Sequence, residues 1–287
     1  MQTTDYTQLI EVHELFSNIN NPDWVIVDCR FDLANPEWGL ADYQQSHIPG
    51  AVYAHLDHDI SGPRTESNGR HPLPAPQTFK EALGRLGIDS TRQVVVYDTS
   101  GGSFAVRLWW MLKYYGHTRV AVLNSGFSTW TASGYPVSSG NYTNPNRVFT
   151  GTPDPSMVVT TAEMENIVGE SRSILIDARA PERFHGDVEP LDPVAGHIPG
   201  AVNRFHQLNL GTDGLWLPPD TLKNEFLTLL GDNRSAQVIV YCGSGVTSCH
   251  LLLAMEVAGL PIARLYAGSW SEWIRDPRHP VVLGDNT

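Results

Sequence analysis

An internal repeat is the feature that most constrains what this chain can fold into. Three motifs of the first half recur in the same order in the second: Val25–Arg30 as Ile174–Arg179, His47–Val52 as His197–Val202, and Gln93–Asp98 as Gln237–Cys242. Self-similarity at a nearly constant spacing indicates two copies of one structural unit. The 287 residues are therefore predicted to form two similar domains.

Each half alternates short apolar strands with helical stretches. We expect strands at 25–27, 94–97, 120–123, 174–176, 238–241 and 262–266, and helices at 77–86, 103–115, 160–168, 220–230 and 247–258. This alternation, with strands apolar on both faces, predicts an α/β fold in which each domain has a mainly parallel sheet flanked by helices. We place the first domain at 1–137, a linker rich in turn residues at 138–156, and the second domain at 157–287.

The charge and the cysteine content exclude several classes of partner. A net charge of −12 and a pI near 5.3 argue against nucleic acid and against anionic membrane surfaces. No apolar run reaches the roughly 18 residues that a membrane span needs. Three cysteines cannot build a disulfide framework, and residues 1–6 lack the basic and apolar stretches of a signal peptide. We therefore expect a protein of the reducing cytoplasm.

Cys242 is the candidate nucleophile. It follows an apolar strand and opens a six-residue turn, Cys242–Thr247, that leads into a helix. Two glycines, Gly243 and Gly245, let the backbone fold tightly, so that several N–H groups can point inward. A helix N-terminus and converging N–H groups lower a thiol pKa from about 8.5 to roughly 3.5–7.5. The alternative is a buried structural cysteine at the end of a strand.

The repeat separates residues that serve the fold from residues that serve function. Both halves share a histidine and an Asp-x-Arg motif, which we interpret as buried caps, turn anchors or ion pairs: His47 and His197, Asp28 with Arg30, and Asp177 with Arg179. Cys242 has Asp98 as its counterpart, so nucleophilic chemistry is expected in the second half alone. Arg183 and His71 have no equivalent in the other half, which makes them candidates for function.

The chain resembles the two-domain rhodanese family over residues 8–283. The motifs that carry the resemblance are His-Ile-Pro-Gly-Ala in each half, the loop Cys242–Thr247 and the segment Gly268–Trp273. The loop is similar to that of the 3-mercaptopyruvate sulfurtransferases, whereas thiosulfate-preferring members carry bulkier basic residues in place of Gly243 and Ser244. The resemblance implies two tandem rhodanese-like domains, the first without a catalytic cysteine, and a sulfurtransferase that needs no cofactor and no metal.

The chemistry that the resemblance implies is two-step covalent catalysis. The Cys242 thiolate attacks the sulfane-type sulfur of a small anionic donor, 3-mercaptopyruvate or thiosulfate, and becomes a persulfide. Cyanide or a thiol such as reduced thioredoxin then takes the sulfur. The backbone of Gly243, Gly245, Val246 and Thr247 is expected to stabilise the sulfur anions, in the manner of an oxyanion hole.

An arginine is expected to bind the carboxylate of the donor. The resemblance assigns this role to Arg183, and the guanidinium group suits it because it binds carboxylates through two hydrogen bonds. The alternative is a surface ion pair with Glu182 or Asp187. Mercaptopyruvate enzymes often carry a second arginine shortly afterwards, but the segment Glu189–Pro193 contains none. The choice between mercaptopyruvate and thiosulfate therefore stays open.

Proton transfer is assigned by the resemblance to Asp57 and His71 working with Ser244, with Asp59 as a substitute for Asp57. A neutral histidine can pass a proton between the donor and the loop. The alternative is that His71 only packs against Pro72 and Pro74.

Three other functions are compatible with parts of the sequence. A phosphatase also uses a cysteine loop that enters a helix, but it needs an arginine at the position of Ser248. A non-catalytic persulfide carrier or redox sensor would have the same loop. A purely structural pair of domains is disfavoured because Cys242 is retained, whereas Asp98 occupies the corresponding place in the first half. Cys249 is interpreted as a core residue, with redox regulation as the minor option.

Overall fold

The chain divides into two compact units, and each unit takes a short segment from the other half of the sequence. The computed structural model describes residues 5–169, 173–231 and 237–285. Unit 1 comprises Met1–Gly62, Leu73–Asp154 and Thr212–Trp216, and unit 2 comprises Pro63–Pro72, Pro155–Gly211 and Leu217–Thr287. The sequence led us to expect a first domain ending at 137 and a second beginning at 157, without this exchange of segments. The first four residues, part of the segment expected to lack a signal peptide, lie outside the described residues.

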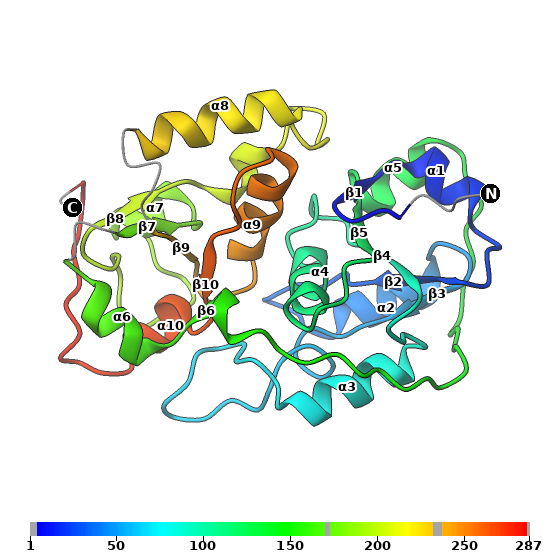
Figure 1. The fold of residues 1–287 in the computed structure, drawn as a ribbon, viewed down its shortest axis with the longest axis horizontal. Helices are drawn as coiled ribbons and strands as arrows, with labels where there is room; N and C mark the ends of the chain where they lie inside the picture. Colours follow the sequence, from blue (N-terminus) through cyan, green and yellow to red (C-terminus); the bar gives the residue numbers. More distant parts are fainter. Residues whose placement is uncertain (1–4, 170–172, 232–236, 286–287) are drawn as a thin grey trace. The chain divides into compact units, whose positions relative to one another are not determined.

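Unit 1 is built on a five-stranded parallel sheet with the order β1-β5-β4-β2-β3 (Figure 1). Its strands are β1 (Leu9–Ile10), β2 (Trp24–Asp28), β3 (Ala51–Tyr53), β4 (Gln93–Tyr97) and β5 (Val120–Leu123). Its helices are α1 (Val12–Ser17), α2 (Trp38–Gln45), α3 (Pro76–Arg85), α4 (Ala105–Tyr114) and α5 (Gly126–Ala132). Because all strands run in one direction, their carboxyl ends meet at one edge of the sheet, where α/β proteins place their sites.

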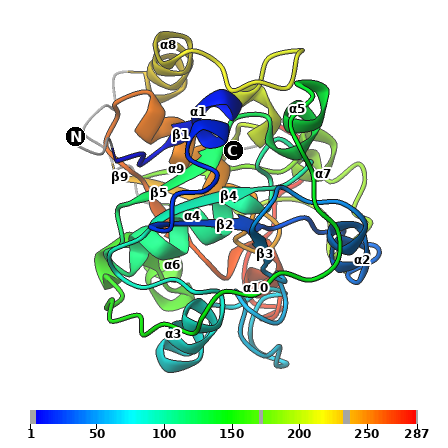
Figure 2. The same ribbon diagram turned by 90° about the vertical axis from the view of Figure 1, so that its right-hand side faces the viewer.

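Helices cover both faces of the first sheet. On one face Leu15 of α1, Tyr43 of α2 and Trp130 of α5 pack with Val95 of β4 into one buried cluster. On the other face α4 packs against β4 and β5. Figure 2 shows this unit with α1 and α5 on one side of the strands and α3 on the other. Burial of each such side chain contributes about 1.5–3 kcal/mol to the stability of the folded unit. The packing of helices on both faces therefore keeps the sheet in place.

Unit 2 repeats this architecture with the strand order β6-β10-β9-β7-β8, again all parallel. Its strands are β6 (Val158–Val159), β7 (Ser173–Asp177), β8 (Ala201–Asn203), β9 (Gln237–Tyr241) and β10 (Arg264–Tyr266). Its helices are α6 (Thr161–Ile167), α7 (Pro181–His185), α8 (Pro219–Leu230), α9 (Ser248–Val257) and α10 (Ser269–Trp273), with 3-10 turns η1 (Pro155–Met157) and η2 (His206–Asn209). The predicted α/β class and tandem parallel sheets are confirmed.

The core of unit 2 mirrors that of unit 1. Met164 of α6, Phe184 of α7 and Trp270 of α10 pack on one face, and α8 and α9 lie together on the other, where α9 contacts β9. Among the described residues, none of the helices has the length and apolar character that crossing a lipid bilayer requires.

The motifs shared by the two halves serve the fold, as predicted. Asp28 pairs with Arg30 at 2.6 Å in unit 1, and Asp177 pairs with Arg179 at 2.6 Å in unit 2, all four side chains being buried. The repeated histidines cap local backbone: the two Nδ1 atoms lie 2.8 Å from the carbonyl oxygens of Tyr43 and Phe184, which accept hydrogen bonds from His47 and His197. The Asp–Arg ion pair and the buried histidine occur in both units. Neither can therefore explain a reaction that takes place in one unit only.

Candidate active site

The Cys242 loop lies at the carboxyl end of β9, where the strand gives way to α9. Its backbone is fixed by the start of α10, because the N–H of Trp270 donates to the carbonyl of Cys242 at 3.0 Å and that of Ser271 donates to Gly243 at 2.9 Å. The Cys242 N–H in turn donates to the Ser269 hydroxyl at 3.2 Å. Three contacts from one neighbouring helix thus hold the nucleophile in place.

The two glycines of the loop meet different surroundings. Gly245 has φ +77°, and a Cβ on it would lie 2.3 Å from the carbonyl oxygen of Ala267. A Cβ on Gly243 would lie 2.6 Å from Nη2 of Arg70. Gly245 allows the tight turn, and Gly243 leaves room for the guanidinium group of Arg70.

The sulfur of Cys242 is surrounded by hydrogen-bond donors. Its side chain is 1% exposed, and the N–H of Gly245 points at Sγ from 3.2 Å. Burial alone would raise the pKa of the thiol, but the hydroxyls of Ser248 and Thr247 and the backbone N–H groups of Ser244 and Ser248 outweigh that effect and lower the pKa below its usual value. The site therefore stabilises the thiolate more than water does, and the predicted inward-facing N–H group of Gly245 is present.

The equivalent loop of unit 1 already contains an anion. The Asp98 carboxylate, which is 1% exposed, accepts backbone hydrogen bonds from Ser100, Gly102, Phe104 and Ala105 at 2.7–2.9 Å. The converging N–H groups lead into α4 in the same way as the Cys242 loop leads into α9. The same backbone turn thus stabilises a carboxylate in one unit and a thiolate in the other.

His71 and Ser244 are brought together as the resemblance implied. The two side chains are 5% and 6% exposed, and Nδ1 of His71 lies 2.8 Å from Oγ of Ser244. His71 reaches the loop because the segment Pro63–Pro72 belongs to unit 2. This segment is bound to the start of α10, where Arg70 donates its N–H to the Ser271 hydroxyl at 3.0 Å and Gly69 donates to Glu272 at 3.3 Å.

Asp57 and Asp59 belong to unit 1, and their part in the chemistry stays a prediction. The backbone N–H of Asp57 donates to Nδ1 of His55 at 3.1 Å. The carboxylate of Asp59 accepts the N–H of His55 at 2.9 Å and pairs with Arg85 at 3.2 Å. Asp59 therefore has a local structural task in unit 1.

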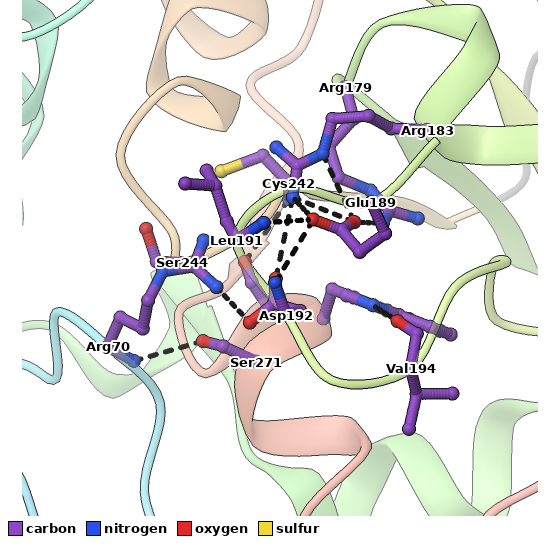
Figure 3. Close-up of polar contacts among 12 residues, drawn as sticks. Arg70, Arg179, Arg183, Glu189, Leu191, Asp192, Val194, Cys242, Ser244 and Ser271 are labelled. Carbon is purple, nitrogen blue, oxygen red and sulfur yellow. Dashed lines mark hydrogen bonds and ion pairs between the residues drawn. The ribbon is translucent and has the colours of Figure 1, made fainter. Parts of the chain in front are cut away.

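Arg183 faces the site but has acidic partners of its own. Its Nε and Nη2 bind the Glu189 carboxylate at 3.1 and 2.7 Å, and Nη2 lies 3.4 Å from Oδ2 of Asp192. These are different partners from Glu182 and Asp187, which the alternative interpretation named. Figure 3 shows Arg183, Glu189 and Asp192 beside the Cys242 loop.

Several functional candidates could not be found from the sequence. They are Arg70, Glu189, Asp192 and Ser248. Arg70 ion-pairs with Asp192, although the two lie 122 positions apart in the sequence. One feature of the sequence could have drawn attention to Arg70: it is next to His71, which has no counterpart in the other half.

Cys249 is a core residue, as predicted. It lies fully buried in the first turns of α9, where its Sγ is 3.5 Å from the carbonyl oxygen of Gly245. None of the three cysteines forms a disulfide. The reactive chemistry of the loop therefore centres on Cys242.

Comparison with known proteins places this geometry in a family. The profile of the Rhodanese-like domain matches residues 11–133 and 160–276. A probable 3-mercaptopyruvate sulfurtransferase from Pseudomonas aeruginosa is 45% identical over 280 residues, which cover 97% of this chain and 99% of that protein. The thiosulfate sulfurtransferase of Rattus norvegicus is 34% identical, with 94% and 93% covered. The crystal structure of SseA from Escherichia coli, described with the rhodanese fold of 3-mercaptopyruvate sulfotransferases, superposes with a TM-score of 0.81 at 31% identity over 93% of this chain and 100% of that one.

Proposed function

This chain belongs to the rhodanese family, and we propose that it moves sulfur from 3-mercaptopyruvate through a persulfide on Cys242 to a thiol or to cyanide. Relatives with sulfurtransferase in their names match nearly the full length of both chains, so the expected reaction class is confirmed. The observation that carries the site assignment is the Cys242 sulfur itself, buried among donors that lower its pKa.

In the first step the Cys242 thiolate attacks the sulfur of the donor. The S–S bond forms as the C–S bond breaks, and the electron pair of that bond passes to carbon as the enolate of pyruvate. The proton that the donor thiol carried is transferred to this carbon, so the products are pyruvate and the Cys242 persulfide anion. The N–H of Gly245 and its neighbours stabilise the anionic sulfur throughout.

The proton moves through His71 and Ser244. Nδ1 of His71 and Oγ of Ser244 are 2.8 Å apart and form a hydrogen bond. This hydrogen bond lies near the nucleophile because Ser244 and Cys242 belong to the same loop. A neutral imidazole accepts a proton on one nitrogen and can release it to an acceptor near the loop. The resemblance also assigns Asp57 to this proton transfer, and we keep it as a proposal.

In the second step an acceptor removes the outer sulfur. Cyanide attacks it and leaves as thiocyanate, which returns Cys242 as the thiolate. A thiol attacks it in the same way and becomes a persulfide. With a dithiol such as thioredoxin, the second thiol then closes a disulfide and releases hydrosulfide, so atoms and electrons balance. A dithiol acceptor fits the reducing cytoplasm that the sequence leads us to expect.

The test is the fate of sulfur in single variants. Cys242→Ser should lose sulfur transfer to below about a thousandth of the wild-type rate, because a hydroxyl cannot form the persulfide. His71→Asn should lower kcat by about a hundredfold or more if it transfers the proton. Mass spectrometry of the resting protein after donor treatment should find one added sulfur on Cys242. Turnover by Cys242→Ser, or added sulfur elsewhere, would contradict the assignment.

Thiosulfate remains the second candidate donor, because a thiosulfate sulfurtransferase is among the relatives. Steady-state assays with both donors side by side rank them. A persulfide carrier would give one stoichiometric burst of thiocyanate, whereas an enzyme gives many cycles. The number of turnovers per protein therefore distinguishes the two functions.

A further inference from the structure

A pocket of about 520 Å³ lies within unit 1 at the amino-terminal edge of its sheet. Its lining includes Trp24, the first residue of β2, together with Gly50, which precedes β3, and Arg92, which precedes β4. Because the strands are parallel, these positions share one edge of the sheet, and the Asp98 loop lies at the other. Small-molecule sites in proteins are concave and measure about 300–1,000 Å³, so the pocket has the size of a ligand site.

The other side of the pocket is formed by a stretch of the linker, residues 140–147, which we call the strap. The linker, green in Figure 1, runs past α3. Four hydrogen bonds tie the strap to α2, to α3 and to the residue after α3: Gly140 N–H to the Gln44 carbonyl at 2.8 Å, Tyr142 N–H to the Tyr43 hydroxyl at 3.0 Å, Arg147 N–H to the Gly84 carbonyl at 3.0 Å, and the Asn144 amide to the Leu86 carbonyl at 2.9 Å. The pocket is therefore formed before any ligand enters it.

The pocket is cationic although the protein is strongly acidic. Arg92 and Arg147 line it, and none of the described residues in its lining is acidic, whereas the whole chain has a net charge of −12. Nη1 of Arg92 donates to the carbonyl of Pro22 at 2.6 Å, which holds this side chain at the pocket. Nη1 of Arg147 lies 3.8 Å from the Asp89 carboxylate, a loose and partly exposed pair that contributes little. Two guanidinium groups at one pocket favour a phosphate group as ligand.

The same pocket offers aromatic surface and amide groups. Trp24 lines it from the sheet and Tyr142 from the strap. The Tyr142 side chain is 47% exposed even though its backbone is fixed by the hydrogen bond to α2. An exposed ring on a fixed backbone is a surface on which a nucleobase can stack. The amides of Asn20 and Asn21, also in the lining, are of the kind that forms hydrogen bonds with the edge of a base.

Unit 2 has a smaller counterpart of this pocket that lacks these groups. It measures about 210 Å³, and Gly200 before β8 takes the place that Gly50 has before β3. Ser173, the first residue of β7, replaces Trp24, the first residue of β2. Among the described residues, the lining of this second pocket contains no charged and no aromatic side chain. The fold therefore accounts for a hollow at this edge of a sheet, but the arginines and aromatic rings are particular to unit 1.

We propose that this pocket binds a nucleoside monophosphate, with the phosphate at Arg92 and Arg147 and the base against Tyr142 and Trp24. The three kinds of group in the lining correspond to the three needs of such a ligand: guanidinium groups for the phosphate, aromatic rings for the face of the base, and amides for its edge. This is a binding site that sulfur transfer does not require, and it lies at the opposite edge of the sheet from the Asp98 loop.

Calorimetric titration of the full-length protein tests the ligand class. The probes are AMP, GMP, CMP and UMP in a buffer without phosphate, and at least one should bind with a Kd below about 1 mM. The corresponding nucleoside lacks the phosphate and ribose 5-phosphate lacks the base, so each should bind at least about tenfold more weakly. Absence of binding by all four nucleotides at millimolar concentration would overturn the proposal, and so would ribose 5-phosphate or the nucleoside binding as tightly as the nucleotide.

Variants of two exposed side chains locate the bound nucleotide without threatening the fold. Arg147→Ala should weaken binding about tenfold to a hundredfold through loss of a charge-assisted hydrogen bond, and Tyr142→Ala about tenfold through loss of stacking. The controls are Arg278→Ala, whose side chain is 87% exposed in unit 2, and Tyr142→Phe, which keeps the ring. Both should bind within about twofold of wild type, and all four variants should retain sulfur transfer. Unchanged nucleotide affinity in Arg147→Ala or Tyr142→Ala would place the nucleotide elsewhere and overturn the proposal.

Discussion

At the scale of single residues, the reactivity of Cys242 depends on short-range hydrogen-bond donors. The thiol is buried, which by itself favours the neutral form, yet its pKa lies below the usual value. Hydroxyl groups contribute to this, and Ser248 is the foremost of them. Ser248 also occupies the position where a phosphatase would need an arginine. A serine here lowers the pKa of the thiol, and it does not supply the cation that would bind phosphate oxygens.

Replacing Ser248 with Ala should raise the pKa of Cys242, because the loop loses a hydroxyl group that lowers it. Only the thiolate is alkylated, so the iodoacetamide reaction of Ser248→Ala should be slower than wild type at pH values below the pKa and equal to it well above. The pH profile of alkylation measures this, with Cys242→Ser as the blank. An identical profile in the two proteins would show that the hydroxyl has no part in ionisation.

At the scale of elements, the strand–turn–helix unit is an anion site in both halves. Asp98 fills it in unit 1 by accepting four backbone N–H groups, two of them from Phe104 and Ala105 at the start of α4. A carboxylate built into the chain thus replaces the thiolate, and the turn keeps its shape. The first unit retains the fold of the site and has lost the nucleophile.

Replacing Asp98 with Ala should destabilise the protein by about 2–4 kcal/mol, because several buried N–H groups lose their acceptor. Urea unfolding at equilibrium measures this. Asp98→Asn keeps one oxygen acceptor and should be affected less. Asp276→Ala, which removes a partly exposed carboxylate on a surface turn, is the control and should unfold much more like wild type. Equal stability of Asp98→Ala and wild type would refute the role of this carboxylate.

The length of a strand or helix decides whether it could be predicted from the sequence. Strands such as β4 and β9 and helices such as α4 were predictable because runs of apolar residues reveal them. The strands β1, β3, β6 and β8, with two or three residues each, are too short to show a period. Cys242, Ser244, His71 and Arg183 could be predicted from motifs. Arg70 and Asp192 could not, since only the folded chain brings them together.

At the scale of the whole molecule, the two halves of the sequence do not coincide with the two units. The segment Pro63–Pro72 comes from the first half and belongs to unit 2, and Thr212–Trp216 makes the reverse exchange. Arg70 and His71 both lie in the first of these segments. Arg70 and His71 are therefore encoded in the first half of the sequence and the nucleophile in the second.

The fragment 155–287, expressed alone, contains Cys242 but lacks Arg70 and His71. Its kcat/KM for mercaptopyruvate should fall at least about a hundredfold below that of the full chain, since proton transfer alone contributes that much. Full-length protein carrying both Arg70→Ala and His71→Ala is the control and should be impaired to a similar degree. Circular dichroism shows whether the fragment is folded. A folded fragment with activity within about tenfold of wild type would contradict the assignment.

The crossing of residues 63–72 into unit 2 has a consequence for how this enzyme can diverge. A change of two adjacent codons in the first half of the sequence alters the surroundings of a nucleophile encoded in the second half. In chimeras that join halves from two relatives at the linker, the preference for one sulfur donor over another would be inherited partly with the amino-terminal parent, even though the persulfide forms on the other.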